Sequence, residues 1–257
     1  MSTNLCADML LLGLADESQI TSVSQQAQDP RRSSFSAAAL RYPANRASAE
    51  EVIMQQPDVV LASRRWQAQH QSDLFARFGI RVVNVPYPND WPGIFSSLLQ
   101  VGELIGRRDR AEEILRQTRA RLQRIPSPQS ALSVLYLRGN GGTAAGGTYI
   151  DALLQGLNVS NKAEDYGLTG WSHVSLESIL LSPPDAFLVS QTRHDVAPGG
   201  SAVTRHPLLR QLLEDRPVLT LSSLDSGCSN WGQVDTVEQL AVRLESRSQA
   251  VPARGRP

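Results

Sequence analysis

Residues 108–125 read Arg-Asp-Arg-Ala-Glu-Glu-Ile-Leu-Arg-Gln-Thr-Arg-Ala-Arg-Leu-Gln-Arg-Ile, close to the middle of the 257-residue chain. Apolar or small side chains recur every three or four residues, the pattern of a helix that buries one face. They are Ala111, Ile114, Leu115, Thr118, Leu122 and Ile125. Pro126 and Pro128 would end the helix. Glu112 is spaced to pair with Arg116, and the arginines would form the solvated face of the helix. At roughly 27 Å long, such a helix could join two halves of the chain as a rigid rod.

The overall composition is that of a globular protein, with 41% hydrophobic and 19% charged residues. The length allows one large domain or two of about 120 residues each. Basic and acidic residues balance at 25 each, so no general attraction to nucleic acid is expected. No apolar run reaches the ~20 residues that span a bilayer, and the first residues lack a complete secretory signal. Taken literally, the chain therefore looks cytoplasmic.

Strands and helices alternate on both sides of the 108–125 helix. We expect strands at 20–23, 58–62, 80–85, 131–137, 185–189 and 217–221, and helices at 4–16, 48–56, 68–78, 90–105, 149–157, 175–181, 208–213 and 234–247. We expect residues 25–47 to be irregular, Arg64, Arg65 and Trp66 to lie in a polar loop, and the tail from Ser248 to be disordered. This alternation indicates parallel sheets covered by helices.

One sequence motif occurs twice, once in each half of the chain. Ser48-Ala-Glu50 is followed after six residues by Pro57-Asp58-Val-Val-Leu, and Ser175-Leu-Glu177 after six residues by Pro184-Asp185-Ala-Phe-Leu. Two lobes with the same helix-to-strand connection follow from this repeat. The two glutamates also have a simple explanation, since the helix dipole favours an acid in the first turn.

Three of the four tryptophans, Trp66, Trp171 and Trp231, fall in polar, loop-like sequence. Ligands of α/β sheets bind outside the carboxyl ends of the strands, where such loops lie. Any one of these tryptophans could simply pack beneath a loop. The three together favour a binding cleft.

The order of these features resembles the helical-backbone class of periplasmic substrate-binding proteins, the vitamin B12 and ferric-siderophore receptors of ABC importers. The matching features are Asn4-Leu5-Cys6-Ala7-Asp8, residues 50–61, Pro86-Tyr87-Pro88, the mid-chain helix, the Gly-rich stretch 139–147, Gly170-Trp171 ahead of residues 175–188, and Arg205-His206-Pro207. The resemblance implies two α/β lobes at 1–106 and 128–247, a rigid helix at 107–127, a ligand cleft between the lobes and a tail at 248–257. It also implies a periplasmic monomer that works with an ABC permease and its ATPase, binds no nucleic acid and needs no cofactor. Such receptors carry a signal peptide and a first strand ahead of the Asn-Leu-Cys turn, and this sequence shows neither.

The resemblance also assigns site residues. Glu50 and Glu177 occupy the positions that dock on permease arginines. The resemblance, together with position in loops, also predicts the residues that line the ligand cleft. They are Asn4, Cys6, Tyr42, Trp66, Tyr87, Asn140, Trp171, Arg193 and Trp231. Their aromatic rings suit a corrin, a haem or a metal chelate, with Arg64, Arg65 or Arg193 available for its negative groups. The histidines show no metal-ligand spacing, and Cys6 and Cys228 show no zinc motif, whereas a disulfide between the two cysteines stays open.

The sequence leaves two other functions open, a nucleotide-dependent enzyme and a stand-alone binding protein. Gly139 to Ala144 loosely fits G-x-G-x-x-[G/A], with Glu164 or Asp165 about 20 residues on, which would suit a nucleotide-dependent enzyme. A lone Gly-rich loop is more often a turn, and no nucleophile has a triad context. The third possibility is a stand-alone binding protein that uses the same cleft without a permease.

Overall fold

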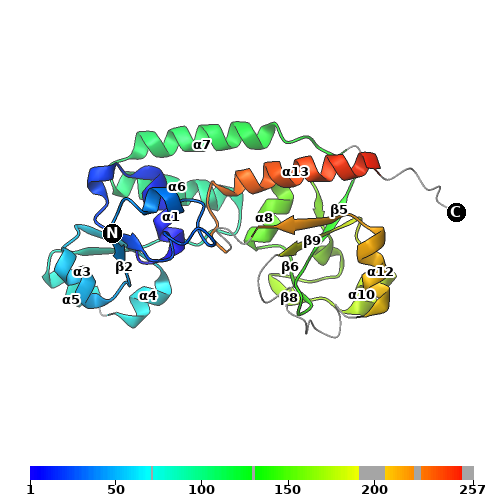
Figure 1. Cartoon of the computed structure of the whole chain (residues 1–257), viewed down its shortest axis with the longest axis horizontal. Coiled ribbons are helices and arrows are strands. Elements are labelled where there is room, and N and C mark those ends of the chain that lie inside the picture. Colours follow the sequence, from blue (N-terminus) through cyan, green and yellow to red (C-terminus); the bar gives the residue numbers. More distant parts are fainter. Residues whose placement is uncertain (71, 129–130, 191–205, 223–226, 251–257) are drawn as a thin grey trace. The chain divides into compact units, whose positions relative to one another are not determined.

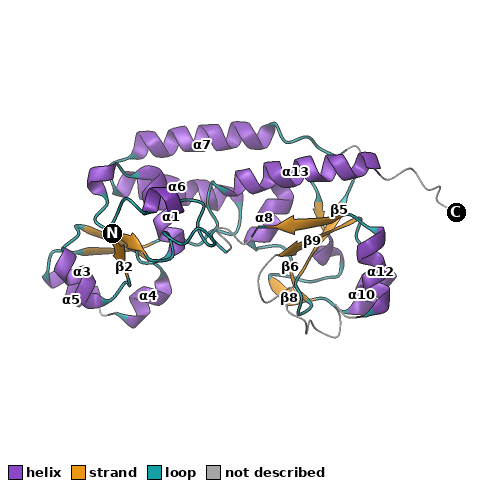
Figure 2. Cartoon of the chain, viewed as in Figure 1, coloured by secondary structure: helices purple, strands orange, loops and turns teal. Residues whose placement is uncertain are grey.

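The computed structural model describes the chain apart from residues 71, 129–130, 191–205, 223–226 and 251–257. It divides into two compact units. Unit 1 comprises Met1–Gln117 and Leu224–Trp231, and unit 2 comprises Thr118–Ser223 and Gly232–Pro257. The division falls within helix α7 (Arg108–Gln123), so the stretch quoted first runs from one unit into the other (Figure 1). Each unit combines helices with parallel strands, which confirms the predicted α/β class (Figure 2).

Unit 1 is built around short parallel strands. Its elements before α7 are α1 (Leu5–Leu14), the 3-10 turn η1 (Glu17–Gln19), β1 (Val23–Ser24), α2 (Ser36–Ala39), β2 (Ala44–Asn45), α3 (Ala49–Gln55), β3 (Val59–Ala62), α4 (Arg64–Gln69), α5 (Ser72–Arg77), β4 (Arg81–Asn84) and α6 (Trp91–Leu104). Strand β3 pairs in parallel with β4, and β1 with β2. The sequence pattern Ser48-x-x-Glu51 predicts a capping box, and it is present in α3: Ser48 accepts from the Glu51 backbone N–H, and the Glu51 carboxylate accepts from the Ser48 backbone N–H.

The first three residues take a strand-like place beside β3. Ser2 forms a parallel bridge with Leu61, and the Leu61 N–H donates to the Met1 carbonyl at 2.9 Å. The Ser2 N–H donates in turn to the Ser22 carbonyl just before β1, at 3.3 Å. Residues 1–3 therefore form an isolated bridge beside β3, although no strand precedes α1 among the described residues. The sequence did not reveal it, because three residues carry no alternation pattern.

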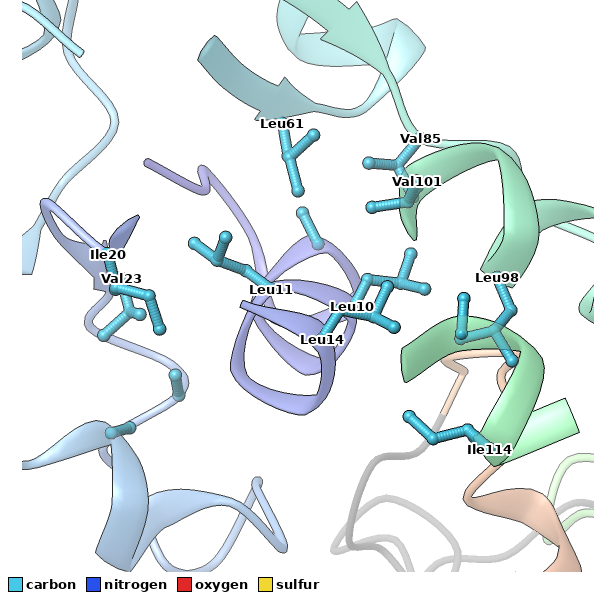
Figure 3. Close-up of a cluster of buried hydrophobic side chains, with 14 residues drawn as sticks. Leu10, Leu11, Leu14, Ile20, Val23, Leu61, Val85, Leu98, Val101 and Ile114 are labelled. Carbon is cyan, nitrogen blue, oxygen red and sulfur yellow. The ribbon is translucent and has the colours of Figure 1, made fainter. Parts of the chain in front are cut away.

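The core of unit 1 surrounds α1, which is buried on nearly every side. Leu10, Leu11 and Leu14 pack with residues of β3, α6 and α7, as Figure 3 shows for Leu61, Leu98 and Ile114. Asn4 begins α1 by accepting from the Cys6 and Ala7 backbone N–H groups. Since the side chain of Asn4 fixes where α1 starts, it also fixes where Cys6 lies.

Unit 2 contains a four-stranded parallel sheet in the order β10-β9-β5-β7 and an antiparallel pair, β6-β8. Its elements after α7 are β5 (Ser133–Leu137), β6 (Gly142–Ala144), α8 (Tyr149–Gly156), β7 (Ser160–Asn161), α9 (Lys162–Asp165), β8 (Trp171–His173), α10 (Leu176–Leu181), β9 (Ala186–Ser190), α12 (Pro207–Asp215), β10 (Val218–Leu221) and α13 (Gln233–Ala250). Leu135, Phe187 and Ile179 form the centre of one of its apolar clusters. The second copy of the repeated motif is thus a capped helix, α10, that leads into a parallel strand, β9. The first copy has the same arrangement, in which α3 leads into β3.

Helix α7 buries Ala111, Ile114 and Thr118, as its sequence pattern predicts. Its ion pairs differ from the prediction, because Glu112 pairs with Arg108, and Arg116 pairs with Glu113. All of these lie within the reach of one helical turn, so spacing alone did not select among them.

Arg121 was expected on the solvated face of α7 with the other arginines, and that expectation is wrong for this residue. Its guanidinium pairs with Asp235 and Glu238 of α13. The Nε–Oε1 distance to Glu238 is 2.8 Å. These hydrogen bonds raise the pKa of Arg121 and lower the pKa of Glu238, so both remain charged at neutral pH.

Several other local predictions are wrong. The stretch of Arg64, Arg65 and Trp66 is helix α4, because Ser63 caps it by accepting from the Trp66 backbone N–H. The irregular segment 25–47 contains α2 and β2, and the Gly-rich loop 139–147 contains β6. The predicted tail from Ser248 begins inside α13, which continues to Ala250, and its remainder lies outside the described residues.

Candidate ligand-binding groove

A groove of about 760 Å³ lies on unit 1, where the carboxyl ends of β3 and β4 meet the start of α1. Three of the predicted ligand-binding residues, Asn4, Cys6 and Tyr87, line it together. Among the described residues, the groove is lined by Asn4, Cys6, Ser63, Arg64, Arg65, Asn84, Val85, Pro86 and Tyr87. This is the edge of a parallel sheet at which α/β proteins bind ligands. Ser63, Asn84, Val85 and Pro86 were missed, although each lies at or next to the carboxyl end of a predicted strand.

The two asparagine side chains that line the groove differ in their hydrogen bonding. The Asn4 side chain is committed to capping α1, with its Oδ1 3.1 Å from the Cys6 backbone nitrogen. Asn84 ends β4, and its buried Oδ1 has no hydrogen-bond partner among the described residues. A buried amide oxygen without a partner is costly, so a donor from a bound molecule or water would be stabilised there.

Two exposed arginines line the groove. Arg64 and Arg65 begin α4 and are exposed, and neither forms an ion pair in the part of the chain that the structure describes. Two cations in the first turn of a helix oppose its dipole, which is an unfavourable placement for stability alone. An anionic ligand would offset that cost, and planar guanidinium groups bind carboxylates through paired hydrogen bonds.

Tyr87 is the large aromatic side chain of the groove, and 54% of its surface is exposed. Pro86 and Pro88 flank it and restrict its backbone. Gly227 lies beside it, since a Cβ at Gly227 would come within 3.4 Å of the Tyr87 hydroxyl oxygen. Gly227 also has a φ of 86°, a conformation that glycine adopts without strain.

A disulfide joins Cys6 to Cys228, with a Cα–Cα distance of 5.0 Å. The sequence had left this pairing open, and the structure resolves it. The bond fastens the returning segment Gly227–Trp231 to the start of α1, next to the groove. Cys6 therefore contributes a disulfide sulfur to the groove and no thiol.

The other predicted ligand residues of unit 1 lie outside the groove lining. Trp66 is buried in a core cluster, where its indole N–H donates to the Ala47 carbonyl at 2.7 Å. Tyr42 and Trp231 are half-buried and pack against the core around α1. For these three side chains the structure shows packing, which the sequence had left open as the alternative for Trp66 and Trp231.

Two more of the predicted ligand residues lie on unit 2. Asn140 is exposed, and its Oδ1 accepts from the Gly142 backbone N–H at 2.9 Å. Trp171 is in strand β8 rather than in a loop, with 53% of its surface exposed and its ring beside Tyr136 and Tyr149. Arg193 falls outside the described residues.

The sequence model of a family described as periplasmic binding protein matches residues 1–213. This match covers most of the chain and decides the family. The chain is a periplasmic binding protein. A search of curated protein sequences finds no match.

Solved structures share the fold of this periplasmic binding protein at low sequence identity. The haem-binding protein HutB of Vibrio cholerae is 18% identical with a TM-score of 0.77, over 95% of this chain and 97% of that one. A protein of Staphylococcus epidermidis described as a possible iron-binding, periplasmic solute-binding protein is 18% identical with a TM-score of 0.75, over 95% and 97%. The haem-binding protein RhuT of Roseiflexus sp. RS-1 is 18% identical with a TM-score of 0.69, over 96% and 98%. The fold predicted from the resemblance is thereby confirmed.

Family membership establishes the general class of function, a solute-binding protein of ABC importers. Among the described residues, no group of three His, Cys, Asp or Glu is arranged to hold a metal ion. No helix in the described part of the chain is both long and apolar enough to cross a membrane.

Glu50 and Glu177 are both exposed, and each is the second residue of its helix. Ser48 caps α3, and Ser175 caps α10 by accepting from the Ser178 backbone N–H. Hydrogen bonds from its own backbone N–H and from the Ser48 hydroxyl lower the pKa of Glu50. Each helix of the repeat therefore presents a carboxylate to solvent, and that of Glu50 is held in its charged form at neutral pH.

The Gly-rich loop does not form an open cradle for a nucleotide phosphate. Within it, the Gly142 N–H donates to Asn140, and the Ala145 N–H donates to the Gly170 carbonyl. Gly146 packs against the Glu164 carboxylate, where a Cβ would approach to within 2.3 Å of an oxygen. A phosphate loop needs several unpaired backbone N–H groups pointing at one anion, so this arrangement gives the nucleotide hypothesis no support.

Proposed function

We propose that this periplasmic binding protein captures a haem or another ferric chelate in the groove on unit 1 and delivers it to an ABC permease. The observation that carries the proposal is the exposed Tyr87 in the same groove as Arg64 and Arg65, two cations without an ion-pair partner among the described residues. The names of two similar structures, HutB and RhuT, describe haem-binding proteins and support the same ligand class.

The chemistry of the groove suits a planar, partly apolar ligand with negative groups at its edge. Tyr87 offers both a ring for stacking and a phenolic oxygen, and tyrosine is one of the side chains that hold haem iron. Arg64 and Arg65 would bind the carboxylates of a haem or the negative oxygens of a siderophore. A corrinoid with neutral amide edges would use these guanidinium groups less well.

Titration of the purified protein distinguishes the ligand classes. Haemin, a ferric hydroxamate siderophore, cyanocobalamin and NAD are each added while tryptophan emission and visible absorbance are recorded. We expect haemin or the siderophore to quench emission at micromolar concentration, and NAD to have no effect. Binding of NAD alone would support the enzyme hypothesis instead, and binding of cyanocobalamin alone would change the ligand class to corrinoids.

Single substitutions then test the groove itself. Loss of a charge-assisted hydrogen bond costs about 1.5–3 kcal/mol, so Arg64→Gln and Arg65→Gln should each weaken binding about tenfold or more. Arg77→Gln, on an exposed arginine of α5 that does not line the groove, is the matched control. Tyr87→Phe keeps the ring and should remove any iron–phenolate absorbance. Unchanged affinity and spectra in all three groove variants would place the ligand elsewhere.

The second part of the proposal concerns the permease, on which Glu50 and Glu177 would dock. Two exposed carboxylates at matching positions of the repeated helices support this assignment. Reversal of both to Lys should stop uptake and leave ligand affinity intact, because neither residue lines the groove. Normal uptake by this variant would favour the stand-alone binding protein.

A periplasmic location fits the covalent structure. Cys6 and Cys228 form a disulfide. Disulfides form and persist in oxidising compartments such as the bacterial periplasm. Fractionation of cells that express the gene, followed by thiol alkylation, tests the location. Protein found in the cytoplasm with two reactive thiols would contradict it.

A further inference from the structure

Two apolar side chains of this protein are unusually exposed. Met54 is 83% exposed and Leu181 is 79% exposed, and these are the largest values among the large apolar side chains that the structure describes. A single exposed apolar residue is ordinary on a protein surface. The positions of these two set them apart.

Met54 and Leu181 occupy equivalent places in the internal repeat. Met54 follows Glu50 by four residues on α3, and Leu181 follows Glu177 by four residues on α10. Residues four apart lie on the same face of a helix, about 5–6 Å from each other. Each unit therefore carries one exposed carboxylate with one exposed apolar side chain beside it, at the same step of the repeat.

Folding does not account for this pairing. Val52 of α3 and Ile179 of α10 are fully buried and supply the packing of these short helices. Met54 and Leu181 leave most of their apolar surface in water. A polar residue at either position would therefore lose little packing within the protein. No described residue forms an ion pair with Glu50 or Glu177.

We propose that Glu50 with Met54, and Glu177 with Leu181, form two matching contact patches for the permease, in which the apolar side chain shields the neighbouring ion pair from water. This inference rests on the docking role proposed above for the two glutamates. An ion pair exposed to solvent contributes little, and it becomes stronger when surrounding contacts exclude water. The partner surface would present a basic side chain next to an apolar one, and it would present this combination twice, once for each patch.

The test measures binding to the permease–ATPase complex of this importer, held in lipid nanodiscs, at several salt concentrations. Met54→Gln and Leu181→Gln replace each apolar side chain by a polar one of similar helix propensity. Leu40→Gln and Val242→Gln are the matched controls, since each changes a similarly exposed apolar residue of unit 1 or unit 2 outside the patches. Glu50→Gln and Glu177→Gln report on the ion pairs.

We expect the Met54→Gln and Leu181→Gln double variant to bind the complex at least tenfold more weakly, with a steeper salt dependence than the wild type and unchanged ligand affinity, because water and salt then reach the ion pairs. The control double variant should bind as the wild type does. The glutamate double variant should lose affinity and also lose most of the salt dependence. Wild-type binding by the Met54 and Leu181 variant, together with weak binding by the glutamate variant, would overturn this inference and leave the docking role intact. Wild-type binding by the glutamate variant would overturn the docking role itself.

Discussion

The buried carboxyl group of Asp8 should make the stability of unit 1 depend on pH. Asp8 lies in the first turn of α1 with its residue surface 0% exposed. Its carboxylate accepts hydrogen bonds from the hydroxyl groups of Ser2 and Ser24 and, at 2.9 Å, from the Ser24 backbone N–H. Burial raises the pKa of Asp8 from 3.8 to about 6, and the hydrogen bonds offset only part of this rise.

The direction of the effect follows from which state binds the proton more tightly. Because the pKa of Asp8 is higher in the folded protein than in the unfolded chain, protonation favours folding. The contribution of Asp8 to stability is therefore fully present below pH 3.8 and is lost as the pH rises through about 6. Two pKa units correspond to about 3 kcal/mol in total, of which about 2 kcal/mol falls between about pH 4.5 and pH 7.

Urea unfolding of the wild type and of Asp8→Asn, each at about pH 4.5 and pH 7, measures this term. The difference between the two proteins is the informative quantity, since groups other than Asp8 titrate in both of them. We expect the wild type to lose about 2 kcal/mol relative to Asp8→Asn on going to the higher pH. Parallel behaviour of the two proteins, within about 0.5 kcal/mol, would refute the assignment of a raised pKa to Asp8.

Two further changes probe how unit 1 is held together. Replacing Cys6 and Cys228 by Ser should lower the free energy of unfolding of the whole chain by up to about 5 kcal/mol, from the chain entropy of a loop of 222 residues. An unshifted thermal transition of the variant would show that the disulfide contributes no stability. Gly13→Ala should cost about 1–3 kcal/mol, because a Cβ there would lie 2.3 Å from Cζ2 of Trp231. Adding Trp231→Phe should recover part of that loss in urea unfolding, and no recovery would mean that the indole is not what the new methyl group meets.

Much of the local structure was determined by the sequence itself. The sequence correctly predicted the buried stripe of α7 and the capping box of Ser48 and Glu51. Helix periodicity and capping depend on residues within one or two turns of each other, so a short window contains the whole cause. The repeat and the family resemblance likewise rest on the order of residues along the chain.

Other features were decided only by tertiary structure. Two of these features bring together residues that are distant in sequence: the disulfide between Cys6 and Cys228, and the groove that Asn4 and Tyr87 both line. The third is the burial of Trp66, which depends on the segments that surround its side chain. Nothing in the local pattern of Trp66 distinguishes a ring packed beneath a helix from a ring that faces a ligand. That distinction depends on which segments fold over it, and packing between distant segments sets both the core and the groove.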